Sequence, residues 1–469
     1  MDVTTQPATH RLWRDVRAAL AGTHQDYTTG SVKRAILLLA VPMVLEMSMQ
    51  SLFSVMDVFF VAKLGPGPVA VVGITDSLLA LIFAIALGLS MGTTAMVARR
   101  IGEGEPDRAA HTAVQAIGVG VLVALVIGAG GVIFAEDLLR LMGADAELAQ
   151  RGRGFTAIML GGNITVVLLF LINAVFRGAG DAVRAMRALW LANGINILLD
   201  PILIFGLGPL PGIGLEGAAW ATTIGRGIGV AYQLRALTRP GGRLQIRREQ
   251  VVLVPAVMAR LMRISAMGML QFLIGTASFV GLFRILARFG PEALAGYTIA
   301  VRIIIFILLP AWGMGNAAAT LVGQNLGAGR PDRAERSVWM TARYNAIFLG
   351  VIGSVLLLFA EPILQPFSDL ERVLEVGVSC LRIVSYSYVF WGFGMVTVLA
   401  FNGAGDTTTP TWINFFAGWV LQIPLAWALA VPLGWGPTGV FVSISVSQVA
   451  LAVIGTLLFR RGTWQRRTV

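Results

Sequence analysis

The sequence GEGEPDRA occupies residues 102–109, and a near copy, GAGRPDRA, occupies residues 327–334. Two further pairs of segments keep the same separation: LGP at 64–66 and FGP at 289–291, and FRGAGD at 176–181 and FNGAGD at 401–406. We call this shared separation the repeat offset; it relates each residue of the first half to its equivalent in the second, as position 102 to position 327. Chance matches would not keep a common register, so we predict that the chain consists of two homologous halves.

Apolar segments fill the sequence between these turns. The chain is 56% hydrophobic and only 13% charged, whereas a soluble domain carries roughly a quarter charged residues. Runs near or above about 20 apolar residues recur, and each is long enough to cross a bilayer as a helix. The runs are continuous rather than alternating, which favours helices over a β-barrel. We predict an all-α membrane protein with about twelve spans.

The basic residues indicate how these spans are oriented. Most arginines lie in one set of short connections and near both chain ends, and the opposite connections are poorer in base: residues 209–216 contain none, and residues 361–375 are mostly acidic. The positive-inside rule then places both termini in the cytoplasm, which requires an even number of spans. The same distribution explains the net charge of +11 without nucleic acid as a partner.

An even number of spans in each half makes the repeat parallel, with a pseudo-twofold axis along the membrane normal, and such pairs enclose a central cavity. We expect a cytoplasmic N-terminal tail (residues 1–30), an N-lobe of six spans (31–240), a cytoplasmic linker (241–255), a C-lobe of six spans (256–460) and a C-terminal tail (461–469). Within the first tail, residues 11–20 are amphipathic and are expected either to lie on the membrane surface or to be disordered.

The sequence contains few residues that could bind a cofactor or catalyse a reaction. Cys380 is the single cysteine, and the three histidines (His10, His24 and His111) are scattered, so we expect no structural metal and no cofactor. A membrane glycosyl or acyl transferase would need a catalytic cluster in a loop, and none stands out. We expect that the protein is not an enzyme.

Three acids interrupt apolar runs in the first half: Glu46, Asp57 and Asp200. Charges near a bilayer centre are expensive and are functional candidates by default. The second half has no acid at membrane depth, and the repeat offset places Leu282 opposite Asp57. Two structural alternatives remain open: Asp57 lies at the outer interface, and Asp200 caps a helix beside Pro201.

Helical spacing groups polar residues around these acids. Glu46 and Asp57 are eleven apart in the sequence, so they share a helix face, and Gln50 lies one turn from Glu46. Asn196 and Asp200 are four apart and can act on one ion. A buried carboxyl can exchange a proton near neutral pH, or hold Na⁺ with a neighbouring amide. Pro42, inside the first apolar run, frees a carbonyl and is expected to bend that helix.

The chain resembles the multidrug and toxic compound extrusion (MATE) family over nearly its full length, and most closely its DinF-like branch. The resemblance is carried by Pro42, Gln50 and Asp57 in the first span, by residues 196–202 (NILLDPI), 217–222 (GAAWAT), 323–329 (GQNLGAG) and 402–410 (NGAGDTTTP). It implies twelve helices in two lobes, a V-shaped central cavity, and export of small molecules driven by H⁺ or Na⁺.

The resemblance also implies a coupling site in the N-lobe. The two aspartates and the asparagine of the DinF-like branch match Asp57, Asp200 and Asn196, and its threonine matches Thr222. The tyrosine position falls on Phe155, which lacks a hydroxyl, so the network differs there. We add Glu46 and Gln50 as candidate coupling residues on the face of Asp57.

Substrates are expected to be small organic cations or drugs, moved across the inner membrane of a bacterium or archaeon by a monomer. Met56, Phe60, Phe155 and Trp220 are candidate cavity residues, although such side chains also face lipid or pack between helices. The alternative function is a flippase for lipid-linked or polysaccharide precursors, which needs cavity arginines for pyrophosphate. Its candidates are Arg284, Arg302 and Arg382.

Overall fold

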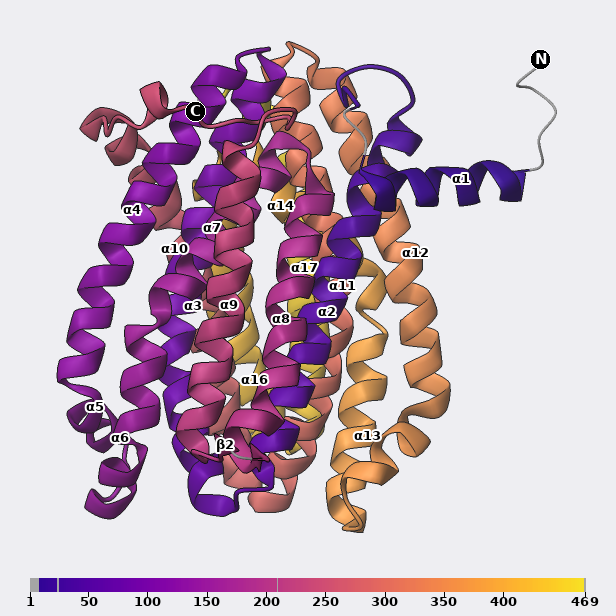
Figure 1. Cartoon of the computed structure of the whole chain (residues 1–469). Helices are drawn as coiled ribbons and strands as arrows, with labels where there is room; N and C mark the ends of the chain where they lie inside the picture. The colour runs from indigo at the N-terminus through magenta and orange to yellow at the C-terminus, as the bar shows by residue number, and fades with distance from the viewer. Residues whose placement is uncertain (1–7, 23–24, 209, 468–469) are drawn as a thin grey trace.

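The computed structural model describes residues 8–22, 25–208 and 210–467, which form one helical bundle (Figure 1). The first half contains α2 (Val32–Ala62), α3 (Pro66–Gly102), α4 (Pro106–Ile133), α5 (Ala135–Leu141), α6 (Ala146–Gly161), α7 (Asn163–Ala179), α8 (Ala182–Phe205) and α9 (Leu215–Thr238). Between α8 and α9, β1 (Gly206–Leu207) and β2 (Leu210–Pro211) form a short antiparallel hairpin.

The second half follows a linker that contains the short helix η1 (Arg248–Gln250). Its elements are α10 (Pro255–Leu286), η2 (Ala287–Phe289), α11 (Pro291–Gly327), α12 (Pro331–Leu364), η3 (Gln365–Phe367), α13 (Glu371–Ser385), α14 (Tyr388–Gly403), α15 (Thr408–Phe415), the π-helix η4 (Phe416–Gln422), α16 (Ile423–Ala430), α17 (Pro437–Arg460) and η5 (Thr463–Arg466).

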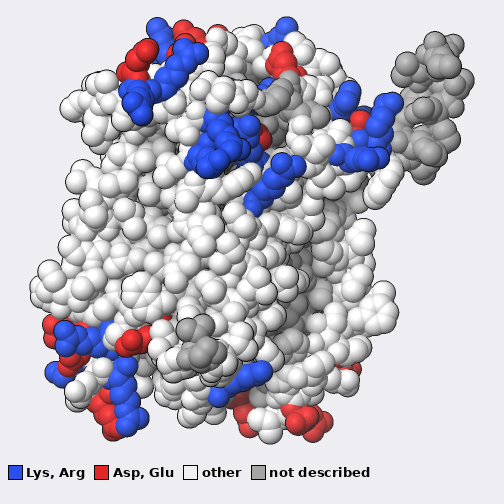
Figure 2. Space-filling model, in the orientation of Figure 1, with Lys and Arg blue, Asp and Glu red and all other residues white. Residues whose placement is uncertain are grey.

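The all-α membrane architecture is confirmed. Among the described residues, ten helical segments are long and apolar enough to cross a membrane, and α13 with α14 forms an eleventh candidate bent by 60°. The remaining expected span is α9, which packs along α8 and is more polar because it contains Glu216, Arg226 and Arg235. A broad uncharged band separates charged residues at the two ends of the molecule (Figure 2), as a bilayer requires.

The backbone repeats with the separation found in the sequence. Helices α3 and α11 begin at prolines related by the repeat offset, and so do α4 and α12. The glycine before each of the first pair, Gly65 and Gly290, has φ of 103° and 96°, a conformation that L side chains rarely adopt. The last helices of the halves, α9 and α17, follow Gly214 and Gly436 (φ 60° and 58°), whose separation is slightly shorter than the repeat offset. These turns identify equivalent positions in the two lobes.

The first and last described helices lie near one end of the bundle, where α3 and α11 finish; we call this end the termini face (Figure 1). Helix α1 (Ala8–Ala21) packs against α2 and projects sideways from the bundle near this end (Figure 1), with Trp13 72% exposed, so the amphipathic segment is helical rather than disordered. The chain after α1 is held by the second half, because Arg333 donates to the carbonyls of Tyr27 and Thr29 at 3.1 and 2.7 Å.

The two halves are tightly closed at the termini face. A Cβ atom on Gly102 would overlap the carbonyl oxygen of Gln324, and one on Gly327 would overlap that of Arg99. Hydrogen bonds cross the same boundary, since Gln324 Nε2 donates to the Gly178 carbonyl at 2.9 Å. Only glycine allows helices α3 and α11 to approach this closely.

We therefore predict that Gly102→Leu opens the termini face. The readout is a cysteine at Thr320, a fully buried position near this closure, in a Cys380→Ala background. In detergent-solubilised protein, a polar maleimide should label this cysteine several times faster in the Gly102→Leu variant than in its parent.

The matched control is Gly67→Leu, on the same helix at a position where an added Cβ would have nothing within 4 Å. It should leave the labelling rate unchanged. Equal rates in the Gly102→Leu variant and its parent would show that the glycine contact does not hold this face closed.

Candidate functional site

Three of the predicted site residues lie together on α8 and α9. Asn196 Nδ2 donates to Asp200 Oδ1 at 3.4 Å and to Thr222 Oγ1 at 3.0 Å, and all three side chains are buried. The helices approach closely here because a Cβ on Gly225 of α9 would lie 2.6 Å from the carbonyl oxygen of Ala192 of α8. Small residues at a helix interface thus place Thr222 beside Asn196.

The cluster contains more acceptors than donors. Asn196 Oδ1 and Asp200 Oδ2 are buried, and neither receives a hydrogen bond from any residue that the structure describes. The single amide group of Asn196 is already shared between Asp200 and Thr222. A buried acceptor without a donor is destabilising by about 1–3 kcal/mol. The pair of oxygens can therefore be satisfied by a proton or a small cation.

Asp57 extends this site from α2. Its side chain is half-buried, and its charge interacts with those of Asp200 and of Arg226 on α9. Asp76 of α3 also interacts with Asp57 and Arg226. Carboxyl groups from α2 and α3 thus interact with one guanidinium group, and we call Asp57, Asp76 and Arg226 the N-lobe charge cluster.

Arg226 was missed in the sequence analysis. Its side chain is 6% exposed, and its guanidinium carbon lies 5.5 Å from the ring centroid of Phe53 and 5.9 Å from that of Phe83. Such contacts with ring faces help to hold a desolvated cation. A lone arginine well inside a predicted span was the signal that could have identified it.

Glu46 belongs to a separate network. Its Oε1 is 3.0 Å from Arg177 Nη1 of α7 and accepts a hydrogen bond from Asn173 at 2.9 Å, and all three side chains are buried. Arg177 belongs to the repeated segment 176–181, which the sequence analysis treats as a turn. That assignment is wrong for Arg177, because α7 continues to Ala179 and this side chain is buried. The carboxylate of Glu46 therefore already has a permanent cationic partner.

The same two positions are uncharged in the second half. The repeat offset relates Glu46 to Gln271 and Arg177 to Asn402, and the side chains of Gln271 and Asn402 are hydrogen-bonded at 3.4 Å. One half thus has an acid with a base where the other has two amides. Both positions are charged in the first half and uncharged in the second. This joint difference in the sequence could have indicated that Glu46 and Arg177 interact.

A cavity of about 280 Å³ lies between the two halves, and we call it the interlobe cavity. Its lining includes Gln50 and Arg177 from the first half and Trp312 and Asn402 from the second. Gln50 Oε1 accepts a hydrogen bond from Asn193 at 3.4 Å. Gln50 therefore reaches the central space on the same helix as Asp57.

Pro42 lies within α2, which is one continuous helix from Val32 to Ala62. Gly313 of α11 packs directly against the helix at this point, since a Cβ there would lie 2.6 Å from the Met43 carbonyl oxygen. The predicted bend at Pro42 stays a prediction.

The predicted substrate residues occupy different environments. Phe155 is buried in an apolar cluster with Val61 and Ala218, and Phe60 packs against that cluster. Met56 is half-buried, and Trp220 is 44% exposed. None of the four lines the interlobe cavity, and their role in substrate binding stays a prediction.

The three arginines proposed for a flippase are Arg284, Arg302 and Arg382. All three are exposed, and none lines the interlobe cavity.

The MatE family profile matches residues 42–202 and 266–428, one segment in each half. The chain belongs to the MatE family. Among related MatE-family proteins, it is 23% identical to the probable multidrug resistance protein NorM of Thermotoga maritima, over 93% of this chain and 94% of that protein. It is 25% identical to the probable multidrug resistance protein YoeA of Bacillus subtilis, over 95% and 97%.

A solved MATE structure has the same fold. The outward-facing conformation of a multidrug resistance MATE family transporter of the MOP superfamily superposes with a TM-score of 0.87 at 27% identity, covering 93% of this chain and 97% of that chain. The predicted MATE membership is confirmed. Assignment to the DinF-like branch stays a prediction.

The Glu46–Arg177 pair allows a direct test of its structural role. We predict that Glu46→Gln lowers stability by about 3 kcal/mol, because it leaves Arg177 buried without a counter-charge. The double variant Glu46→Gln/Arg177→Asn reproduces the amide pair of the second half and should recover most of this loss. The measurement is the thermal unfolding midpoint of the detergent-purified protein; a double variant as unstable as Glu46→Gln would contradict the interpretation.

Proposed function

We propose that this MatE protein exports small, mostly cationic or amphipathic molecules in exchange for H⁺ or Na⁺, which re-enter through the N-lobe carboxyls. Its relatives NorM and YoeA are described as probable multidrug resistance proteins, which supports an export role. On this proposal the protein lies in the inner membrane of a bacterium or archaeon, and the base-rich termini face is cytoplasmic.

One observation carries the coupling proposal. Asp200 Oδ2 and Asn196 Oδ1 are buried acceptors without donors among the described residues, beside a carboxyl, Asp57, that is only half-buried. A proton on Asp200 would turn one oxygen into a donor, and Na⁺ would be coordinated by the oxygens that now lack partners. Either ion would satisfy the site, and Asp57 offers it a polar approach.

Competition for negative charge then links the ion to the substrate. When Asp57 and Asp200 are ionised, they attract an organic cation; when they are neutralised by an ion from outside, that attraction is lost and the substrate is released. One charge moving through 100 mV supplies about 2.3 kcal/mol, roughly a fifty-fold gradient. A bend of α2 at Pro42 would carry the change from Asp57 to the interlobe cavity.

Export from proteoliposomes tests this proposal, with the permanent cation 10-methylacridinium as the substrate. Export is measured under a pH gradient alone and under a Na⁺ gradient alone. The parent protein should respond to one of the two gradients. Asp57→Asn and Asp200→Asn, which keep the side-chain size but remove the charge, should each reduce driven export to background.

The control variant is Asp369→Asn, which removes a carboxylate of similar chemistry at an exposed position between η3 and α13. It should export at the parental rate. Export by Asp57→Asn at that rate, under the gradient that drives the parent, would reject the assignment of the N-lobe carboxyls.

A further inference from the structure

The second half contains a cavity of about 330 Å³, which we call the C-lobe cavity. It corresponds in the repeat to the N-lobe charge cluster. The repeat offset relates Asp57 to Leu282 and Asp76 to Val301, and the slightly shorter separation of the turns before α9 and α17 relates Arg226 to Gln448. Leu282, Val301 and Gln448 all line the C-lobe cavity. Each charged member of the N-lobe cluster thus has an uncharged counterpart in the wall of this cavity.

The wall of the C-lobe cavity is polar but uncharged. No acidic or basic residue is among the described residues that line it, whereas four side-chain amides do: Gln271, Asn414, Gln422 and Gln448. An amide offers both a donor and an acceptor, so it can pair with either kind of ligand group. A cation placed here would lack a counter-charge in a low-dielectric site, which is strongly unfavourable.

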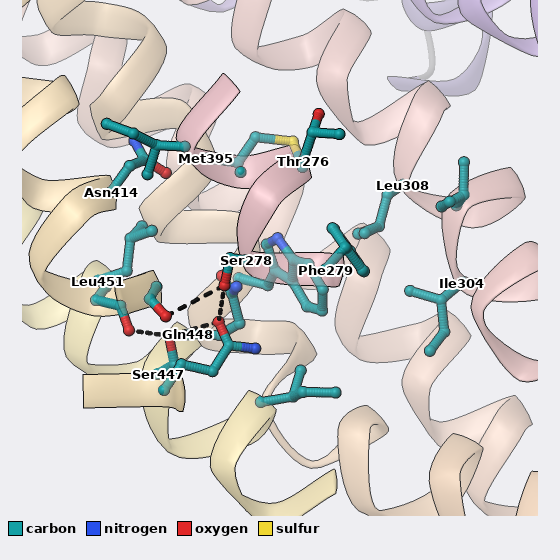
Figure 3. Close-up of a pocket in the computed structure, with 18 of the residues that line it drawn as sticks. Thr276, Ser278, Phe279, Ile304, Leu308, Met395, Asn414, Ser447, Gln448 and Leu451 are labelled. Atoms are coloured by element: carbon teal, nitrogen blue, oxygen red, sulfur yellow. Dashed lines mark hydrogen bonds between the residues drawn. The ribbon is translucent and has the colours of Figure 1, made fainter. Parts of the chain in front are cut away.

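Two of the four amides, Gln422 and Gln448, are available to bind a ligand. Ser278 and Ser447 donate to the carbonyls of Gly418 and Ala417 at 3.1 and 2.9 Å (Figure 3). Their distances to Gln422 Oε1, 3.4 and 3.5 Å, are long for hydroxyl hydrogen bonds, so they hold this amide weakly. Gln448 makes no hydrogen bond with any residue that the structure describes.

Tyr297 gives independent support for a ligand. Its side chain is fully buried and lines the C-lobe cavity, and its hydroxyl has no hydrogen-bond partner among the described residues. A buried hydroxyl without a partner is destabilising by about 1–3 kcal/mol, and a ligand acceptor would remove that penalty.

The backbone of the C-lobe cavity is also unusual. Gln422 lies at the end of the π-helix η4, which interrupts the span formed by α15 and α16. The equivalent span of the first half, α8, is α-helical throughout. Short π-helical segments occur frequently at functional sites. In Figure 3, Ser278, Ser447 and Gln448 group on one side of the cavity, while Leu308 and Ile304 lie on the other. The cavity therefore has a polar edge and an apolar wall.

The C-lobe cavity adjoins the interlobe cavity. Phe272 and Trp312 line both, and their rings stack with centroids 5.7 Å apart and planes inclined by 26°. Together with Leu399, which also lines both, this pair of rings separates the two spaces. Aromatic rings at this boundary favour stacking with a flat aromatic molecule.

We propose that the C-lobe cavity is a binding site for uncharged, planar aromatic molecules with an amide-like edge of N–H and C=O groups, reached from the interlobe cavity. The amides and Tyr297 recognise the polar edge, and the apolar wall covers the ring faces. The site's place in transport rests on the proposed export function. On these proposals, the N-lobe binds the coupling ion and positively charged groups, and the C-lobe binds neutral aromatic groups.

Binding to the detergent-purified full chain tests this site without any ion gradient. The probes are acridone, an uncharged three-ring molecule with one N–H and one C=O, and 10-methylacridinium, its cationic counterpart. Gln448→Leu should weaken acridone binding on the order of tenfold, as expected for one lost hydrogen bond to a buried group. Binding of 10-methylacridinium should change by less than about twofold.

Two nearly isosteric variants distinguish the loss of a binding contact from misfolding, because they barely change the shape of the side chain. Tyr297→Phe removes a single oxygen and should weaken acridone binding severalfold. Gln448→Glu adds a negative charge and should weaken acridone binding while strengthening that of 10-methylacridinium. The matched control, Gln365→Leu, removes an exposed amide in η3 and should change neither.

The outcomes separate this site from the export function. Acridone binding unchanged in both Gln448→Glu and Tyr297→Phe would overturn the C-lobe site, whatever the transport result. Asp57→Asn should retain acridone binding even though it abolishes driven export. Acridone binding lost in Asp57→Asn and retained in the Gln448 variants would instead place acridone in the N-lobe and reject the proposal.

Discussion

A charge buried among membrane helices needs a partner, because lipid supplies neither water nor counter-ions. This chain meets the requirement in two ways. Glu46 has a fixed partner, the guanidinium of Arg177, at 3.0 Å. Asp200 has no such ion pair among the described residues: Asn196 donates to one carboxyl oxygen, and the other, like Oε2 of Glu46, receives no hydrogen bond. The charge of Glu46 is thus already balanced by a guanidinium group, whereas that of Asp200 leaves room for an ion that binds and dissociates.

The internal repeat makes this difference visible, because each half serves as a reference for the other. The backbone repeats in its glycine turns and in the prolines that begin its helices, but the polar chemistry does not. Where the first half has Asp57 and Arg226, the second has Leu282 and Gln448. The same scaffold therefore holds charges in one lobe and neutral hydrogen-bonding groups in the other, and on our proposals this divides ion coupling from the recognition of uncharged rings.

The closure of the termini face depends on a different constraint, the absence of side chains. Gly102 and Gly327 allow α3 and α11 to meet backbone to backbone, and the long-range hydrogen bonds of Gln324 and Arg99 cross the same boundary. Close packing of small residues replaces the hydrophobic effect, which is weak between helices in lipid. Such a contact can separate as a unit, because it contains few interdigitating side chains.

The sequence by itself determined the helical membrane class, the internal repeat, and the pair Asn196 and Asp200, because hydropathy, a fixed offset and helical spacing can be read from the chain alone. Thr222 was added to this pair through the resemblance to the MATE family. The sequence did not reveal that Glu46 is paired with Arg177, that Arg226 lies among the N-lobe acids, or that Tyr297 lines an uncharged cavity. Only the tertiary structure decided these points. Their partners lie on helices far apart in the sequence, and which faces of those helices meet depends on how the whole bundle packs.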